Sequence, residues 1–469
     1  MAHLHAQEFP ERARDALTDG PLRQAIARAT DTIGDRRAKA VLEIPEWEEL
    51  REQARAVKAH TLARLDHYLL QFVGNAERQG IVVHWARDHA EACSILGDLA
   101  AAAGAHPIAK SKSMVTEEIG LNRVLEERGL RPVETDLGEW IVQLAGEMPS
   151  HIIVPAIHKS RQQIADLFAS KLNVDRTEDP AELTRIARRI LREEFVDAGL
   201  GISGVNFAIA ETGSILLLEN EGNIRLTTSL PKVHVAVMGV EKLLPRLADL
   251  EVFLRLLPRS GTGQRLTTYQ SLLTGAKRRL GDEGPEAVHL LILDNGRSSM
   301  LRNELERETL ACIRCGACLN ACPVYRHVGG HSYGSVYPGP IGAIVTPQLA
   351  GIGAAGELPF ASSLCGACRD VCPVKIDIPR MLLRLRARAV APSPGESARP
   401  RPWSERLGFR LWAWAMTSAS RYRLTSRLAR WFHGPLVRFG PLRAWCADRE
   451  PPRPAPRPFR DLWEKGSIQ

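Results

Sequence analysis

Apolar and polar positions alternate at helical spacing through the first 75 residues. The stretches QAIARATDTIGDRRAKAV (24–41) and EWEELREQARAVKAHTLARLDHYLLQFVGNAERQG (46–80) place apolar residues three and four positions apart, with charged residues between them. Gly74 and Gly80 are the stop signals near the end of this region. The pattern predicts an N-terminal helical region over residues 1–75.

From residue 80 the pattern changes to short apolar runs that are typical of strands. The runs are IVVHWA (81–86), HIIVPA (151–156), VNFAIA (205–210), SILLLEN (214–220), VHVAVMG (233–239) and VHLLILD (288–294). Helical stretches separate them, such as residues 179–199, where Asp179 is the expected cap and Pro180 the first helical residue. Alternating strands and helices predict a mainly parallel α/β sheet over residues 76–300.

One stretch in this region does not fit the alternation of strands and helices. SILLLENEGNIRLTTSL (214–230) has two apolar runs on either side of the polar sequence Glu221-Gly222-Asn223. Two runs about a short polar turn with a central glycine are typical of antiparallel pairing. The stretch therefore predicts a β-hairpin.

The last third of the chain divides by composition. Residues 301–390 hold seven of the nine cysteines between two apparent helices (299–310 and 378–390) and are expected to form a separate domain. The sequence APSPGESARPRPW (391–403) is rich in Pro, Ser and Gly and predicts a linker. Beyond it the chain is rich in arginine and tryptophan, so residues 391–469 are expected to comprise this linker and a basic helical C-terminal region.

Composition and charge exclude some classes of protein. An apolar content of 44% and a charged content of 25% are ordinary for a globular chain, and 469 residues are enough for two or three domains. The net charge of +8 belongs to the tail, because residues 391–469 carry fourteen Arg and one Lys against six Asp and Glu. The first 390 residues therefore sum to about −1, which argues against binding to nucleic acid.

The N-terminus and the apolar runs bear on location. No run approaches the ~18 apolar residues that a membrane span requires. The opening sequence MAHLHAQEFPERARDAL is charged from the start and lacks the apolar core of a signal peptide. We therefore expect a cytoplasmic protein, in which the isolated Cys93 and Cys446 are small buried side chains rather than disulfide partners.

The first cysteine motif has the spacing of a bacterial [4Fe–4S] site. It reads Cys312-x2-Cys315-x2-Cys318-x3-Cys322-Pro323. Three thiolates from one tight loop reach the same cluster, and the fourth points away before the proline turns the chain. Structural zinc is the alternative, but paired C-x2-C zinc sites usually lack a C-x3-C-P ending. The spacing therefore favours iron and sulfide.

The second motif, SSLCGACRDVCP (362–373), has Ser362 where a complete motif would have another cysteine. In two-cluster ferredoxins the fourth cysteine of a motif binds the other cluster. Applied to both motifs, this rule assigns two clusters. Cluster I, expected to be [4Fe–4S], takes Cys312, Cys315, Cys318 and Cys372, and cluster II takes Cys322, Cys365 and Cys368. Cluster II is then [3Fe–4S], or [4Fe–4S] with Ser362, a histidine or solvent as its fourth ligand.

The 42 residues between Cys322 and Cys365 are too many for a minimal ferredoxin. They resemble the larger helical ferredoxin domain of succinate dehydrogenase and fumarate reductase iron–sulfur subunits. The glycine-rich part of this segment contains Tyr325, Tyr333, Tyr337, His327 and His331. We interpret it as a packing loop that shields the clusters; a docking surface, or a histidine ligand for cluster II, is the alternative.

The α/β region has no sequence motif for a nucleotide. It lacks GxGxxG after a strand and GxxxxGK[ST], so NAD-dependent chemistry and a P-loop are not supported. Polar residues at expected strand ends are the candidates for ligand binding, although a capping or surface ion-pair role is simpler for each one. These candidates are Lys110, Lys112, His158, Lys159, Glu211, Thr212, Asn223 and Arg225.

Several stretches together resemble the lactate utilisation protein B (LutB) family. They are AETGSILLLENEGNIRLTTSLPKVHVAVMGVEKLLP (210–245), AKSKSMVTEEIGLN (109–122) and PSHIIVPAIHKSRQQI (149–164), followed by the two cysteine motifs and the Trp/Arg-rich tail. The resemblance implies a LUD domain similar to the NagB/RpiA/CoA-transferase-like folds. It also implies a three-protein system that oxidises L-lactate to pyruvate, with LutA-like and LutC-like partners. Some members of the family carry cysteine at the position of Ser362.

The sequence and the resemblance together lead to one functional hypothesis with two alternatives. The hypothesis is an iron–sulfur electron-transfer subunit of an L-lactate-oxidising complex, with His158 as a weak candidate for the proton acceptor. The first alternative is an iron–sulfur subunit of another 2-hydroxyacid or glycerol 3-phosphate dehydrogenase. The second is a non-enzymatic redox sensor or scaffold. The basic C-terminal region is expected to pack on itself or on a partner, with contact to an anionic membrane as the alternative.

Overall fold

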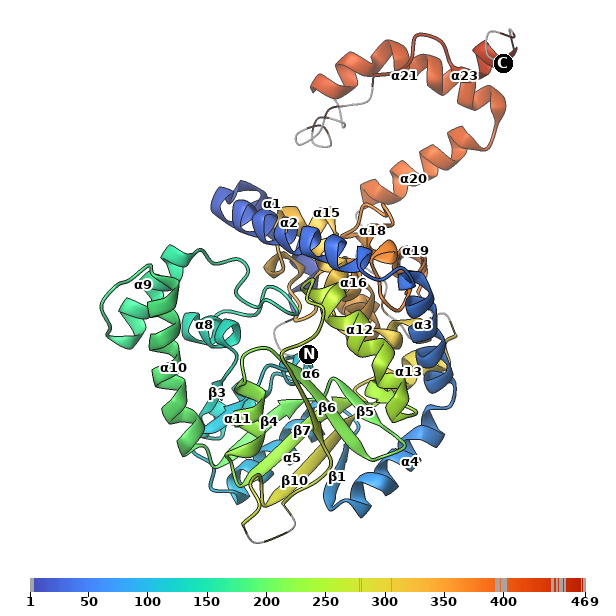
Figure 1. Ribbon diagram of the computed structural model, residues 1–469. Helices are drawn as coiled ribbons and strands as arrows, with labels where there is room; N and C mark the ends of the chain where they lie inside the picture. Colours follow the sequence, from blue (N-terminus) through green and yellow to red (C-terminus); the bar gives the residue numbers. More distant parts are fainter. Residues whose placement is uncertain are drawn as a thin grey trace. The chain divides into compact units, whose positions relative to one another are not determined.

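The structure, a computed structural model, divides into two compact units, Met1–Arg399 and Pro400–Gln469 (Figure 1). It describes residues 4–277, 279, 281–304, 306–392, 397, 403–439, 443, 446, 450, 453–464 and 466. The first unit contains two β-sheets and the cysteine-rich region.

The N-terminal region is helical, as the spacing of apolar residues predicts. A short 3₁₀ turn, η1 (Ala6–Glu8), precedes α1 (Phe9–Thr18), α2 (Gly20–Leu42), α3 (Trp47–Ala63) and α4 (Leu65–Arg78). Helix α2 begins where the Asp19 carboxylate accepts the Leu22 N–H and Pro21 supplies a preset backbone angle. Helix α4 passes through Gly74 without interruption and ends before Gly80, so only the second glycine acts as a stop.

A six-stranded parallel sheet forms the centre of the first unit. Its strand order is β1-β10-β7-β4-β2-β3, and every neighbouring pair is parallel. The strands span β1 (Ile81–Ala86), β2 (Ile108–Lys110), β3 (Pro132–Glu134), β4 (Leu200–Gly204), β7 (Val233–Gly239) and β10 (Ala287–Leu293). Most of their side chains are buried, as expected of a sheet covered on both faces. The predicted parallel α/β sheet is thereby confirmed.

Helices cover one face and one edge of this sheet. Leu96 and Leu125 belong to the core beneath α5 (His89–Ala102), α6 (Met114–Glu118) and α7 (Leu121–Glu127), which packs on the central strands. Trp140, Phe168 and Phe195 form another core between β3 and three helices, α8 (Leu137–Ala145), α9 (Arg161–Leu172) and α10 (Pro180–Asp197). Asp179 caps α10 by accepting the Ala181 N–H, as predicted.

The other face carries α4 and a second, smaller sheet. Its order is β8-β5-β6-β9, with the strands β5 (Phe207–Ile209), β6 (Ser214–Glu219), β8 (Leu243–Leu244) and β9 (Tyr269–Leu273). The turn η2 (Val240–Lys242) links β7 to β8, and η3 (Leu247–Asp249) leads into α12 (Leu250–Gly261). This layer also adjoins the cysteine-rich region, so it connects the α/β core to the metal-binding part of the chain.

The predicted hairpin at 214–230 is wrong. Strand β6 pairs with β5 and β9 instead, and the second run forms the helix α11 (Asn223–Ser229). The carboxylate of Glu219 accepts the N–H groups of Ile224 and Arg225 at 2.6 and 2.8 Å, and these bonds stabilise the first turn of the helix. Polar residues and Gly222 at a φ of 83° therefore end the strand but start a helix rather than a return strand.

The predicted strand at 151–156 is also wrong, because this segment is an irregular loop. The His151 ring nitrogen Nδ1 accepts the N–H groups of Ile153 and Val154 at 3.0 and 3.1 Å. The Ile153 carbonyl in turn accepts a hydrogen bond from the Lys112 ammonium at 2.6 Å. Side chains therefore satisfy the backbone groups that a strand would have paired.

The cysteine-rich region is built from short helices and turns between α13 (Arg297–Arg302) and α19 (Ile378–Val390). Its buried residues share one core with α1, α2, α3 and α12, so this region packs on the N-terminal helices. In chain order its other elements are η4 (Arg307–Ala311), α14 (Ala317–Asn320), α15 (Pro323–Val328), η5 (His331–Tyr333), α16 (Gly339–Ala350), α17 (Ile352–Ala355), η6 (Leu358–Phe360) and α18 (Ala367–Asp370).

The second unit is helical in its described part. It contains α20 (Trp403–Met416), α21 (Ala419–Phe439) and α23 (Phe459–Glu464). Several large apolar side chains on these helices are exposed, including Trp403, Trp412 and Trp431. Within the described ranges, no helix combines the length and apolarity needed to cross a membrane.

Candidate metal centre and adjoining pocket

The first cysteine motif folds into a tight loop followed by one turn of helix. The Arg314 N–H lies 3.4 Å from Cys312 Sγ and points at it, and Arg314 has a φ of 61°. Gly316, with a φ of 73°, then leads into α14, which carries Cys318. The left-handed residues on either side of Cys315 curl the chain so that successive thiols lie on the inside of the loop.

The second motif repeats this geometry with serine in the first position. The Leu364 N–H donates to Ser362 Oγ at 3.1 Å, and Leu364 has a φ of 57°. Gly366, with a φ of 89°, leads into α18, which carries Cys368. The hydroxyl of Ser362 therefore has the same place in its loop as the thiol of Cys312 has in the first.

The seven cysteines gather into two neighbouring groups. Cys312, Cys315, Cys318 and Cys372 line one small cavity together with apolar residues such as Ile152 and Ile341. Mutual repulsion among these four thiols contributes, after burial, to raising the pKa of Cys315 and Cys318. This group combines three cysteines of the first motif with the last cysteine of the second, which is the composition that cross-ligation predicts.

The second group contains Cys322, Cys365 and Cys368. Burial raises the pKa of Cys368 to about 12, with Cys322 and Cys365 as the next charged neighbours that raise it. Cys365 is exposed, whereas Cys322 and Cys368 are buried. This group therefore reaches the surface of the unit, and the group that contains Cys315 lies inside it.

The donor set fits iron–sulfur clusters. Cys322 Sγ accepts the Tyr325 N–H at 3.5 Å and Cys372 Sγ accepts the Ile376 N–H at 3.4 Å. Such N–H groups aimed at sulfur are a recurrent feature around iron–sulfur clusters and tune their potentials. Because buried thiolates repel one another, their convergence is favourable when they bind a positively charged metal centre. The predicted packing role of the inter-motif loop also agrees with the burial of Tyr325, Tyr333 and Tyr337.

Two arginines of the N-terminal helices hold the second motif, and the sequence alone does not reveal them. The buried Arg51 of α3 donates to the main-chain carbonyls of Cys372, at 2.9 and 3.0 Å, and of Arg369, at 3.2 Å. Arg37 of α2 donates to the Val371 carbonyl at 3.2 Å. Their partners are backbone groups more than 300 residues away, so no local pattern marks these arginines.

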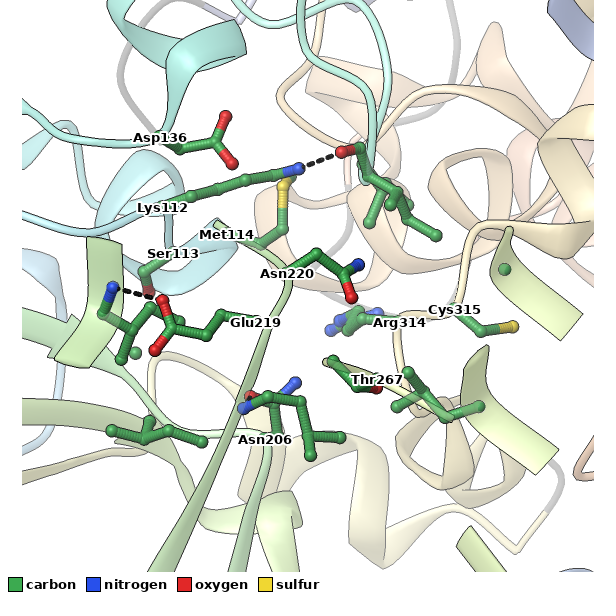
Figure 2. Close-up of a pocket in the computed structure, with 18 of the residues that line it drawn as sticks. Lys112, Ser113, Met114, Asp136, Asn206, Glu219, Asn220, Thr267, Arg314 and Cys315 are labelled. Atoms are coloured by element: carbon green, nitrogen blue, oxygen red, sulfur yellow. Dashed lines mark hydrogen bonds between the residues drawn. The ribbon is translucent and has the colours of Figure 1, made fainter. Parts of the chain in front are cut away.

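A cavity of about 430 Å³ adjoins the first cysteine group (Figure 2). It lies between the second sheet, the loop at 152–155 and the first cysteine motif, and Cys315 forms part of its wall. Its polar lining includes Lys112, Ser113, Asp136, Asn206, Glu219, Asn220, Glu221, Asn223, Lys242, Thr267 and Arg314. This cavity is the candidate ligand-binding pocket of the molecule.

Positive side chains lie on the cysteine side of the pocket. The Arg314 guanidinium packs over the Tyr337 ring, 4.6 Å from its centroid, and Nη2 lies 3.7 Å from the Glu241 carboxylate. Its buried Nη1 has no hydrogen-bond partner among the residues that the structure describes. Burial lowers the pKa of the nearby Lys242 to about 8 against the opposing effect of Glu241.

Carboxylates lie on the other side, and each already accepts a backbone hydrogen bond. Glu219 caps α11, Asp136 caps α8 by accepting the Glu139 N–H at 3.1 Å, and Glu221 accepts the Leu137 N–H at 3.1 Å. Desolvation in the pocket, and then repulsion from Asp136, raise the pKa of Glu221 to about 7. The pocket therefore has a cationic wall beside Cys315 and an acidic wall opposite it.

The polar candidates from the α/β sequence divide between the pocket and structural roles. Lys112 and Asn223 line the pocket. Lys110 is instead buried between Glu117 and Glu134, and Arg225 lies over the ring of Tyr269. The other two support turns, since Glu211 accepts the Leu247 N–H and Thr212 accepts the Ser214 N–H.

His158 lies outside the pocket lining. Its Nε2 is 2.7 Å from the Glu147 carboxylate, which Lys159 also contacts at 2.6 Å, and its ring is 4.5 Å from the His331 ring. Burial, and then His331, lower the pKa of His158 to about 4. The three side chains Glu147, His158 and His331 form a compact group on the loops that surround the second cysteine group.

Family models match three consecutive parts of the chain. A LUD domain matches residues 69–293, a 4Fe-4S dicluster domain matches residues 308–376, and the C-terminal region of lactate utilisation protein B matches residues 383–467. The lactate utilisation protein B of Bacillus thuringiensis (strain Al Hakam) is 44% identical over 469 residues, which covers 98% of each chain. The chain belongs to the lactate utilisation protein B family.

Other comparisons agree with this membership. The lactate utilisation protein B of Bacillus cereus (strain AH187) shows the same 44% identity over 98% of both chains. The 4Fe-4S dicluster match contains all seven clustered cysteines, so the chain is an iron–sulfur protein. A DUF162 family protein from Deinococcus radiodurans matches 49% of this chain and 98% of its own, at 14% identity and a TM-score of 0.28, which is too weak a likeness to identify the fold.

Proposed function

We propose that this protein is the iron–sulfur electron-transfer subunit of a complex that oxidises L-lactate to pyruvate. Its partners in this proposal are LutA-like and LutC-like subunits. Full-length similarity to lactate utilisation protein B of two Bacillus species supports the assignment to this system. The cysteine groups, which have the spacing and surroundings of iron–sulfur ligands, support the electron-transfer role.

The ligand assignment follows the two cysteine groups. Cluster I takes Cys312, Cys315, Cys318 and Cys372, and cluster II takes Cys322, Cys365 and Cys368. The clusters supply one-electron transfer when they are bound. Ser362 is placed at the fourth position of cluster II because its hydroxyl matches the Cys312 thiol in loop geometry.

The arrangement of the residues gives the protein an interior side and an exterior side. Cys315 borders the pocket, and Cys365 is exposed on the surface. A donor in the pocket would therefore lie next to the buried group, and an external acceptor would meet the exposed one. The border between the pocket and Cys315 is the observation that carries the proposal.

Anaerobic stopped-flow absorbance tests the proposal directly. Mixed with its two partner subunits and L-lactate, the reconstituted protein should lose its visible iron–sulfur absorbance within the turnover time of the complex. D-lactate, glycolate and glycerol 3-phosphate are the control substrates. Equal or faster reduction by glycolate or glycerol 3-phosphate would assign the protein to a different dehydrogenase. No reduction by any of the four would favour a sensor or scaffold.

A further inference from the structure

One cation in the pocket lacks an acceptor. Arg314 Nη1 is buried, and no residue that the structure describes accepts a hydrogen bond from it. The arginine side chain is only 10% exposed, and it is held in the pocket by the Tyr337 ring behind it. A buried donor without an acceptor costs about 1–3 kcal/mol, so an acceptor from outside the chain would be stabilised at this position.

The charges around Arg314 also favour an anion. The buried cations near the pocket outnumber the buried carboxylates that contact them, because Glu118 and Glu241 are shared among four positive side chains. These cations are Lys58, Lys242, Arg297 and Arg314. The neighbouring cysteine thiolates offset part of the positive charge. Arg314 and Lys242 both face the pocket, where a bound anion would offset more of it (Figure 2).

The opposite wall restricts which anion fits. Asp136, Glu219 and Glu221 all line the pocket and would repel a multiply charged group such as a phosphate ester. They already accept backbone hydrogen bonds, so they do not require a cation. Asn220 and Glu221 can still pair with a hydroxyl or keto oxygen at that side of the pocket. The pocket therefore suits a singly charged acid with a second polar group.

We propose that this pocket binds a small 2-hydroxy or 2-oxo acid, with its carboxylate on Arg314 and Lys242 and its 2-oxygen toward Asn220 and Glu221. The site rests on the proposed function, in which a 2-hydroxy acid is the electron donor, and it places that donor on this chain beside Cys315. A cavity of about 430 Å³ is larger than a three-carbon acid requires, so acids with longer side chains are expected to bind as well.

Isothermal titration calorimetry on the anaerobically reconstituted full chain tests the site without turnover. L-lactate, pyruvate and 2-hydroxybutanoate are the probes, with propionate as the acid that lacks a 2-oxygen and inorganic phosphate as a competing anion. We expect the three probes to bind at least about tenfold more tightly than propionate and phosphate. Equal binding of propionate or phosphate, or no binding of the probes at millimolar concentration, would overturn the site.

Variants identify the residues that hold the acid. Arg314→Gln should weaken pyruvate binding at least about tenfold, whereas Arg123→Gln, at a 53% exposed arginine on α7, should leave it unchanged. Because Arg314 lies between two cysteines, iron is counted in each variant. If Arg314→Gln loses iron, Lys242→Gln and Asn220→Ala replace it as the tests. Unchanged pyruvate affinity in these variants would overturn the assignment.

The two proposals fail separately. If the complex reduces its clusters with L-lactate but this chain binds no 2-hydroxy or 2-oxo acid, the pocket assignment is wrong and the electron-transfer function stands. If this chain binds pyruvate through Arg314 but L-lactate reduces nothing in the assembled complex, the pocket stands and the proposed function is wrong.

Discussion

Arg51 on α3 donates two hydrogen bonds to the main-chain carbonyl of Cys372, at 2.9 and 3.0 Å. A third bond, to the Arg369 carbonyl at 3.2 Å, joins the same guanidinium to the turn before Cys372. The N-terminal helices thus fix the position of a cysteine that lies more than 300 residues away in sequence. The helical region is therefore part of the metal-binding architecture.

Replacing Arg51 with alanine should loosen the second motif. Two buried carbonyls would lose charge-assisted hydrogen bonds, which together stabilise the motif by about 2–4 kcal/mol. We expect fewer irons per chain after purification and faster loss of visible absorbance on warming. Arg55→Ala is the matched control, since Arg55 lies one turn further along α3 and is half exposed. Equal iron content and equal bleaching rates in the two variants would contradict this role for Arg51.

Cross-ligation can be tested with three alanine variants. If Cys372 belongs with Cys312, then Cys312→Ala and Cys372→Ala should change the same EPR signal, and Cys368→Ala should change the other. The double variant Cys312→Ala/Cys372→Ala should then lose no more than about four irons, because both changes affect a single cluster. Ligation within each motif predicts the reverse grouping, with Cys372 and Cys368 sharing one signal. EPR of reduced protein with iron analysis decides between them.

His234 predicts a loss of stability in mild acid. It lies buried in β7 with its ring 2.8 Å from the Ser203 hydroxyl, and burial, followed by His289, lowers its pKa to about 4. The unfolded chain, with a pKa near 6.5, binds a proton that the folded chain rejects. Stability should therefore fall as pH drops from about 6.5 toward 4 and change no further below that.

The His234→Gln variant isolates this contribution. Between pH 6.5 and 5 one such histidine should cost about 2 kcal/mol, and the glutamine variant should lose that much less over the same interval. Anaerobic urea unfolding of both proteins at the two pH values, followed by far-UV circular dichroism, measures the difference. His60→Gln, at an exposed histidine on α3, is the control and should keep the pH dependence of the original chain. Identical pH dependence in all three proteins would contradict the prediction.

Local patterns were sufficient where local forces decide the structure. Helical spacing predicted the N-terminal helices, and the continuous apolar runs of β7 and β10 predicted buried parallel strands. They failed where a side chain satisfies the backbone, as His151 does for the loop at 151–156 and Glu219 does for α11. No propensity for strand or helix contains such a bond.

The metal-binding residues could be predicted more fully than the pocket. Cysteine spacing reflects covalent geometry within one loop, so the seven cysteines stand out in the sequence. The pocket instead combines residues from 112 to 315 that approach one another only after the sheets have formed. Arg314 illustrates the difference, because its position between Cys312 and Cys315 is plain but its unpaired, buried Nη1 depends on Tyr337 and Glu241.

The equivalence of Ser362 and Cys312 gives the sharpest prediction for cluster II. Both residues accept an N–H from the residue two positions later, at 3.1 and 3.4 Å, and both precede a left-handed residue and a left-handed glycine. A thiol at residue 362 should therefore point where the Cys312 thiol points. Ser362→Cys should fold normally and shift the EPR signal or potential of cluster II. A rise from about seven to about eight irons per chain would mean that a [3Fe–4S] cluster became [4Fe–4S].

Ser363→Cys is the matched control, because Ser363 is the exposed neighbour in the same loop. It adds a thiol at the surface without replacing the hydroxyl that faces the loop interior, so the EPR spectrum and iron content should match those of the original chain. If Ser362→Cys is equally silent in EPR, potential and iron content, residue 362 does not face cluster II. The fourth position would then belong to solvent or to a histidine, and His331, beside His158, would be the next residue to substitute.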